Sequence, residues 1–177
     1  MFFRDFRGDG DTWMFTLEGD RKPLPLIEGP GSQQDANVSP DGRWIAYTSS
    51  ESGRNGIYVQ PLPPTGAKYQ ITATRPSRPV WSPDGRQIFF LEQRPNSDTG
   101  ASLMSVDVRT QPGFSYSNPT RLTDEIRNLG NRPYTVMPDG RVMFLHRPAA
   151  TPDQRPRNPE IRVTLNWFEE LEQRVPR

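Results

Sequence analysis

Few side chains in this sequence are of types that carry out chemistry. His146 is the only histidine and there is no cysteine, so a Ser-His-Asp triad or a zinc site would depend on one imidazole. That imidazole follows an apolar run without a candidate nucleophile in a recognised turn, and we expect it to pack at a strand edge. The kinase motifs (a Gly-rich phosphate loop, His-Arg-Asp, Asp-Phe-Gly) and the Gly-x-Ser-x-Gly turn of hydrolases do not occur. The sequence therefore predicts no catalytic residue, no metal and no cofactor.

Two short motifs near the N-terminus have a simpler interpretation than a binding site. Asp9-Gly10-Asp11 could share a hard cation between two carboxylates, but Trp13 and Asp20 occupy the positions at which an EF-hand loop needs further ligands. We interpret this motif as a polar hairpin turn. The cell-adhesion tripeptide Arg7-Gly8-Asp9 is expected by chance in an arginine-rich chain.

The elements that would position any site come from a segment that occurs three times. Residues 38–43, 81–86 and 136–141 each place Pro-Asp-Gly-Arg between an apolar residue and a β-rich run. Proline presets φ, aspartate tolerates the next position and glycine supplies a positive φ, so the unit is predicted to be strand, tight turn, strand. Successive aspartates of the repeat are 43 and 55 residues apart. This spacing suits propeller blades of roughly 40 to 50 residues, with an insertion in the last interval.

Both faces of the strand after each turn are apolar, as in Ile88-Phe89-Phe90-Leu91. An antiparallel strand with one face in water would not show this pattern, whereas a strand between two stacked blades would. Further strands are expected at 2–6, 12–17, 24–27, 57–61, 69–72, 103–108, 120–123 and 161–165. The sequence thus predicts an all-β chain, a partial β-propeller of about three to four four-stranded antiparallel blades. The blades are expected at roughly 1–28, 29–73, 74–124 and 125–166, followed by a short C-terminal helix at 167–175.

Composition excludes several classes of partner. The 177 residues are 32% hydrophobic and include 20 prolines, which favours many short strands joined by polar turns. A net charge of +1 gives no field that would attract nucleic acid. No apolar run reaches the roughly 18 residues of a membrane span, so neither a nucleic-acid partner nor membrane insertion is predicted.

The repeats resemble those of the TolB-like, WD-repeat-like β-propellers of bacteria. Residues 36–48 and 79–91 match the Ser-Pro-Asp-Gly-Lys/Arg motif and its following strand, whereas the third copy has Met137 in place of the serine. More narrowly, 13–26, 56–71 and 163–176 look like the C-terminal propeller of bacterial receptor-type serine/threonine protein kinases. The resemblance implies a noncatalytic domain and a periplasmic or extracytoplasmic location. The same propeller also occurs in translocation proteins and as the gating domain of prolyl oligopeptidases, so the resemblance does not identify a ligand.

Candidate binding residues follow from the expected propeller, in which the first strand of each blade lines a central channel. The residues just before the apolar end of that strand differ among the copies. We expect the following to face the channel: Gln34, Asp35, Asn37, Arg78, Arg132 and Tyr134. Such a lining suits recognition of a peptide or protein segment, and a solvated channel wall is the alternative.

The sequence thus predicts a noncatalytic protein-interaction or ligand-sensing module. The alternative is the noncatalytic regulatory or gating part of a serine/threonine kinase or a prolyl oligopeptidase-like peptidase. Fewer than four blades leave sheet edges open, so we expect the chain either to be part of a longer protein or to form a homodimer that completes the ring.

Overall fold

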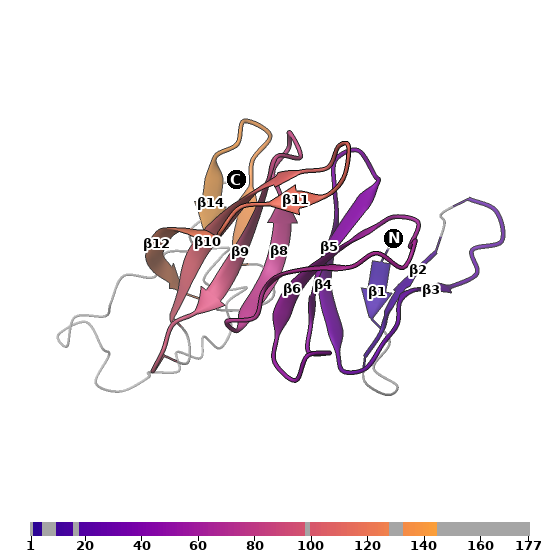
Figure 1. The fold of residues 1–177 in the computed structure, drawn as a ribbon, viewed down its shortest axis with the longest axis horizontal. Coiled ribbons are helices and arrows are strands. Elements are labelled where there is room, and N and C mark those ends of the chain that lie inside the picture. The colour runs from indigo at the N-terminus through magenta and orange to yellow at the C-terminus, as the bar shows by residue number, and fades with distance from the viewer. Residues whose placement is uncertain (1, 5–9, 16–17, 98–99, 128–132, 145–177) are drawn as a thin grey trace, which may run out of the picture. The chain divides into compact units, whose positions relative to one another are not determined.

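The computed structural model describes residues 2–4, 10–15, 18–97, 100–127 and 133–144, and within these ranges the chain is all-β (Figure 1). They all belong to one compact unit, 1–146. No helix that could cross a membrane occurs in the part that is described. The predicted strand at 161–165, the predicted helix at 167–175, and the residues Arg132 and His146 lie outside it.

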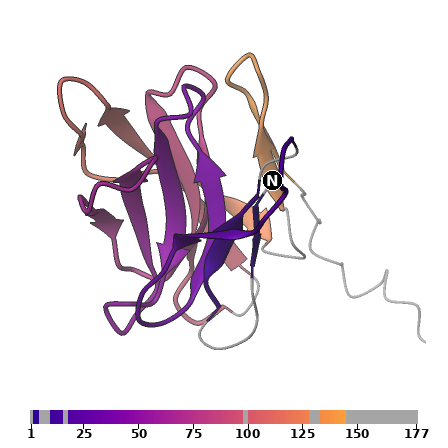
Figure 2. The ribbon, with the colours of Figure 1, turned by 90° about the vertical axis from the view of Figure 1, so that its right-hand side faces the viewer.

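Four antiparallel sheets follow one another along the chain, and the strands of each lie side by side (Figures 1 and 2). The first has the order β1 (Phe2–Arg4), β2 (Thr12–Met14), β3 (Leu24–Ile27). The second has the order β4 (Gln33–Val38), β5 (Trp44–Ser49), β6 (Gly56–Pro61), β7 (Tyr69–Thr72). The third contains β8 (Pro76–Trp81), β9 (Gln87–Gln93), β10 (Gly100–Arg109), β11 (Ser115–Tyr116) and β12 (Thr120–Arg127). The last described sheet pairs β13 (Tyr134–Val136) with β14 (Val142–Phe144).

The repeated turns are hairpin corners, as predicted. In the second copy, Gly85 has a φ of 69°, and the Ser82 hydroxyl donates to Oδ1 of Asp84 (2.6 Å) while accepting from the Gln87 N–H (2.9 Å). The Arg86 N–H donates to the same carboxylate oxygen (3.1 Å). The Ser82 hydroxyl, followed by this backbone bond, holds the pKa of Asp84 below its usual value. Every one of these contacts is made within six residues, so the turn needs no other part of the chain.

The core confirms that the strands after the first two turns, β5 and β9, pack on both of their faces. The strand after the third turn, β14, differs from the prediction: Val142 and Phe144 pack against a cluster, whereas Met143 is exposed. The neighbours Phe89 and Phe90 are both buried but belong to different clusters. Phe90 packs with residues of the second sheet that include Trp44, and Phe89 packs with residues of the last described sheet that include Tyr134. A third cluster joins the first sheet to the second. Because alternate side chains point to opposite faces, a strand that is apolar throughout must lie between two sheets.

The third sheet is more elaborate than predicted. Its strand β10 has ten residues, and two separate strands pair with its outer edge: β12 along Gly100–Ser105 and β11 at Val108 and Arg109. The start of β12 is predicted by the sequence, whereas β11 is not, because its two exposed residues follow a polar loop and carry no periodic signal.

Candidate functional site

The first strands of the second and third sheets contain β-bulges at equivalent positions. The register of β4 with β5 shifts between Gln34 and Asn37, and that of β8 with β9 shifts between Ser77 and Val80. Each bulge contains a residue in the left-handed region, Asp35 with φ 54° and Arg78 with φ 55°. This conformation costs a residue other than glycine about 1–3 kcal/mol and persists only where neighbouring contacts hold it.

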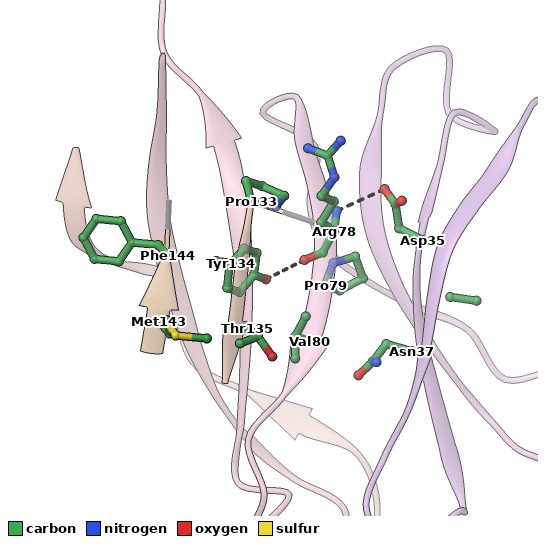
Figure 3. Close-up of a pocket in the computed structure, with 11 residues that line it drawn as sticks. Asp35, Asn37, Arg78, Pro79, Val80, Pro133, Tyr134, Thr135, Met143 and Phe144 are labelled. Atoms are coloured by element: carbon green, nitrogen blue, oxygen red, sulfur yellow. Dashed lines mark hydrogen bonds between the residues drawn. The ribbon is translucent and has the colours of Figure 1, made fainter. Parts of the chain in front are cut away.

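Hydrogen bonds between sheets hold these bulges. Oδ2 of Asp35 accepts from the Arg78 N–H (3.2 Å), and the Tyr134 hydroxyl lies 2.5 Å from the Arg78 carbonyl and 3.1 Å from the Phe89 carbonyl (Figure 3). Burial is the main cause that raises the pKa of Tyr134, so its hydroxyl stays protonated and donates at neutral pH. At the bulge, the backbone N–H and carbonyl of Arg78 therefore form hydrogen bonds with side chains of the two neighbouring sheets, Asp35 and Tyr134.

Asn37 makes a second connection between the same sheets. Its Oδ1 accepts from the backbone N–H of Trp81 (3.0 Å), and its carbonyl accepts from the indole N–H of Trp81 (3.1 Å). The Trp81 side chain is buried. Asn37 thus lies at the site and also fixes β4 to β8.

The bulges form one wall of a pocket of about 660 Å³, which we call the inner pocket. Strands β4 and β8 provide one part of its lining, and the β13–β14 hairpin with Pro133 provides the other (Figure 3). Its apolar lining residues are Ala36, Pro79, Val80, Pro133, Met143 and Phe144. Its polar lining residues are Asp35, Asn37, Arg78, Tyr134 and Thr135. The inner pocket therefore combines an apolar floor with one carboxylate and one guanidinium.

The structure brings together four of the six residues singled out from the sequence: Asp35, Asn37, Arg78 and Tyr134. Gln34 is not among the lining residues; its amide donates to the Ser32 hydroxyl (3.0 Å). Arg132 lies outside the described residues. Met143 and Phe144 were not predicted as lining residues, because an apolar strand after the turn is typical of the core. The feature of the sequence that could have indicated them is that this strand is apolar on both faces.

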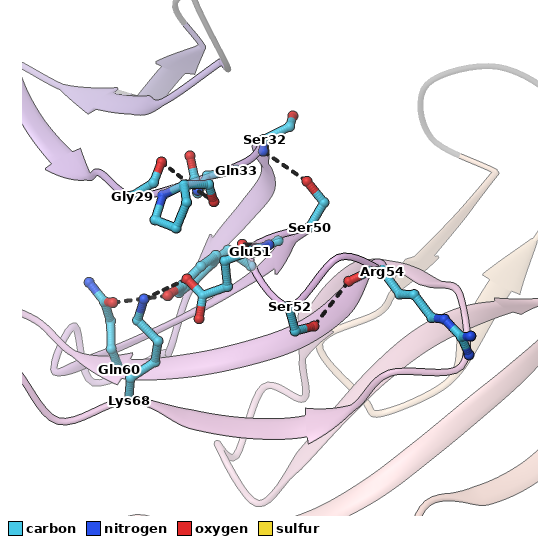
Figure 4. A network of polar contacts seen from close by, with 12 residues as sticks. Gly29, Ser32, Gln33, Ser50, Glu51, Ser52, Arg54, Gln60 and Lys68 are labelled. Carbon is cyan, nitrogen blue, oxygen red and sulfur yellow. Dashed lines mark hydrogen bonds and ion pairs between the residues drawn. The ribbon is translucent and has the colours of Figure 1, made fainter.

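A second polar cluster lies around the start of β4 (Figure 4). The amide of Gln33 donates to the carbonyls of Gly29 (3.4 Å) and Pro30 (3.2 Å), and its Oε1 is buried without a hydrogen-bond partner. Nearby, Lys68 pairs with Glu51 at 2.7 Å. These contacts hold the turn before β4. Within the described residues no group of three metal-ligating side chains comes together.

Comparisons with curated proteins give short matches. No family model matches the chain. It is 46% identical over 43 residues to a tricorn-like protease N-terminal subunit from Sulfurisphaera tokodaii, a match that covers 24% of this chain and 22% of that protein. It is 25% identical over 92 residues to a dipeptidyl-peptidase 5 from Emericella nidulans, covering 41% of this chain and 13% of that protein. The chain thus spans less than a quarter of either relative.

Solved structures match over much more of the chain. TolB from Acinetobacter baumannii superposes with a TM-score of 0.64 at 22% identity, covering 85% of this chain and 35% of that one. A TolB structure from Agrobacterium tumefaciens gives a TM-score of 0.63 at 23% identity, covering 82% and 52%. A chain of a nidogen/laminin complex gives 0.52 at 19% identity, covering 75% and 45%. Together with the antiparallel sheets and the repeated turns, these matches show that the chain has the fold of a TolB-like β-propeller.

Proposed function

We propose that this chain is a noncatalytic interaction module that binds an extended peptide segment of a protein partner in the inner pocket. The observation that carries the proposal is the combination of an apolar floor with a charged rim. Met143 lies in the lining with 60% of its surface exposed. An apolar side chain of the partner would cover it, and Asp35 and Arg78 would orient the flanking main chain.

The size and rigidity of the inner pocket support a peptide ligand. Its volume of about 660 Å³ is large enough to take more than one side chain. Its wall is fixed by the hydrogen bonds of Asp35 and Tyr134, so little conformational entropy is lost when a ligand binds. The nidogen/laminin neighbour belongs to a complex of two proteins, which supports a propeller of this kind as a protein-binding surface at the level of fold. We place the module outside the cytoplasm because of the resemblance to TolB-like propellers.

Selection from a random-peptide display library on the immobilised chain tests this proposal. The affinity of a selected peptide is then measured by fluorescence anisotropy for the wild type, for Met143→Glu and for Arg78→Gly. Glycine keeps the positive φ of position 78 while it removes the guanidinium. We expect each variant to bind at least about tenfold more weakly.

Leu122→Glu is the matched control, since Leu122 is a 50% exposed apolar residue on β12 and does not line the inner pocket. This control should bind like the wild type. Selected peptides whose affinity is unaffected by both pocket variants would contradict the proposal, and so would an equal loss in the control.

A second candidate function is that of a noncatalytic gating or regulatory part of a peptidase. The observation that favours it is the pair of matches to peptidase-related proteins. A hydrolase domain encoded next to this chain in the same reading frame would support this candidate, and a kinase domain would instead support the receptor-kinase resemblance. In either case we expect no activity from the isolated chain.

A further inference from the structure

A second pocket lies at the end of the third sheet that carries its repeated turn. It has a volume of about 940 Å³ and is formed by the β8–β9 turn and the β10–β11 hairpin. The polar side chains of its lining include Asp84, Arg86, Asp107, Arg109 and Ser115. We call it the polar pocket. It shares no residue with the inner pocket.

The same place in the second sheet is closed by aromatic side chains. Trp44 lies three residues after the repeated aspartate and packs against Tyr69 and Phe114, with ring centroids 6.2 Å and 5.0 Å away. It faces Pro61 across the strand pair. The sheet is therefore covered by apolar contacts at this end.

The third sheet has polar residues at the equivalent positions. Gln87 lies three residues after its repeated aspartate and takes the place of Trp44. It faces Asp107, which takes the place of Pro61. The amide of Gln87 donates to Oδ1 of Asp107 at 2.8 Å. Thr120 pairs with Ser105 of β10, and at the equivalent position of the second sheet Tyr69 pairs with Val59 of β6. Three apolar positions have thus become polar together, which argues for a polar ligand rather than for a packed interface.

The β10–β11 hairpin adds a wall that the second sheet lacks. Its alternate residues separate by face: Phe114 is buried against Trp44, whereas Asp107 and Arg109 are exposed. Ser115 pairs with Arg109 across the hairpin, so both side chains lie on the same face. The hairpin therefore covers one sheet with its apolar side and lines the polar pocket with the other.

The groups that remain available in the polar pocket are planar and of both signs. Arg86 and Arg109 form no ion pair within the described part of the chain, and Oδ2 of Asp84 and of Asp107 accepts no hydrogen bond there. A guanidinium presents two parallel donors, which match two neighbouring hydroxyl groups, and Oδ2 of each carboxylate can accept from a further hydroxyl. Two acids and two bases leave the pocket without the net charge that a phosphate or a metal ion would need. The ring of Tyr116 lies on the other side of the hairpin, beside that of Phe114 (centroids 6.0 Å apart), and its hydroxyl donates to the carbonyl of Gln70 (2.8 Å).

We propose that the polar pocket binds a neutral oligosaccharide, held by Arg109 through a pair of neighbouring hydroxyl groups and by Oδ2 of Asp107 through one more. This inference does not depend on the inner pocket or on its peptide.

Isothermal titration of the full 177-residue chain with neutral hexasaccharides tests it. The probes are α-1,4-glucose, β-1,4-glucose, β-1,4-xylose and β-1,4-N-acetylglucosamine hexamers, with a heparin hexasaccharide as the anionic comparison. We expect at least one neutral probe to bind with a Kd below about 1 mM. Asp107→Asn and Arg109→Ala should each weaken it at least about tenfold.

Arg43→Ala is the matched control, because Arg43 occupies the position of Arg86 in the turn of the second sheet. It should leave the affinity within about twofold of the wild type. Circular dichroism and size-exclusion chromatography establish that the variants are folded. The proposal is overturned if no neutral hexasaccharide binds at about 10 mM, if only the heparin probe binds, or if Arg43→Ala weakens binding as much as the pocket variants do.

Discussion

Replacement of Asn37 by alanine separates a structural role of the inner-pocket residues from a role in binding. In the folded chain Oδ1 of Asn37 accepts the backbone N–H of Trp81 at 3.0 Å, and Trp81 is only 4% exposed. Alanine leaves that N–H buried without a partner, which costs about 1–3 kcal/mol. The bond from the indole N–H to the carbonyl of residue 37 remains, because it uses the main chain. We therefore expect a loss of about 2 kcal/mol in the free energy of unfolding.

Urea denaturation followed by tryptophan fluorescence measures this loss. For a chain of this length it corresponds to a decrease of about 4–8 °C in the melting temperature. Asn37→Asp retains an acceptor oxygen and should recover most of the stability. Gln34→Ala is the control on the same strand, since its amide bonds only to Ser32 among the described residues; it should cost less than about 1 kcal/mol. Unchanged stability of Asn37→Ala together with a loss of peptide affinity would refute the reasoning and make Asn37 a ligand contact.

Four further predictions follow from the turns, the core and the sheet edges. Gly85→Ala should destabilise by about 1 kcal/mol because of the positive φ, whereas Gly113→Ala, at an open position without a positive φ, should be neutral or slightly stabilising in the same urea titration; equal effects would contradict the turn assignment. Phe90→Ala should cost about 3–5 kcal/mol, seen as partial or complete unfolding by circular dichroism, and an unchanged melting temperature would refute burial between two sheets. The pKa of Asp84 is lower in the folded than in the unfolded chain, so its contribution to the free energy of unfolding is present above the unfolded pKa and is lost as the pH falls through the folded pKa. Between about pH 5 and pH 2, Asp84→Asn should therefore lose less stability than the wild type. Parallel curves of stability against pH for the two proteins would exclude the Ser82 contact as a source of stability. If two copies pair through their sheet edges, light scattering should give about twice the 20.2 kDa mass of the chain, and a stable monomer at micromolar concentration would exclude the dimer.

Sequence predicted the parts of this fold that are determined locally. The turn at Gly85 could be predicted because proline, aspartate and glycine each restrict their own backbone, and the burial of Phe89 and Phe90 could be predicted because both faces of the strand are apolar. The bulges could not be predicted. Asp35 and Arg78 have no intrinsic preference strong enough to give a positive φ, and the contacts that hold them come from neighbouring sheets.

The candidate site was predicted in part for the same reason. Asp35, Arg78 and Tyr134 were found from their place ahead of an apolar strand end, which depends only on the repeat. Gln34 does not line the inner pocket, because side chains alternate along a strand and the bulge begins only after this residue.

The self-contained turn has a consequence for how such a chain can change during evolution. Since Ser82, Asp84 and Gly85 satisfy one another within a few residues, a blade can be duplicated or moved without loss of its corner. The connection between blades is not self-contained: Asn37 needs the tryptophan of the blade that follows, and Arg78 needs the tyrosine of the next. Blades of this chain are therefore alike in their turns but not interchangeable in order. A chain with the same blades in another order would keep its hairpins and lose the hydrogen bonds between neighbouring blades.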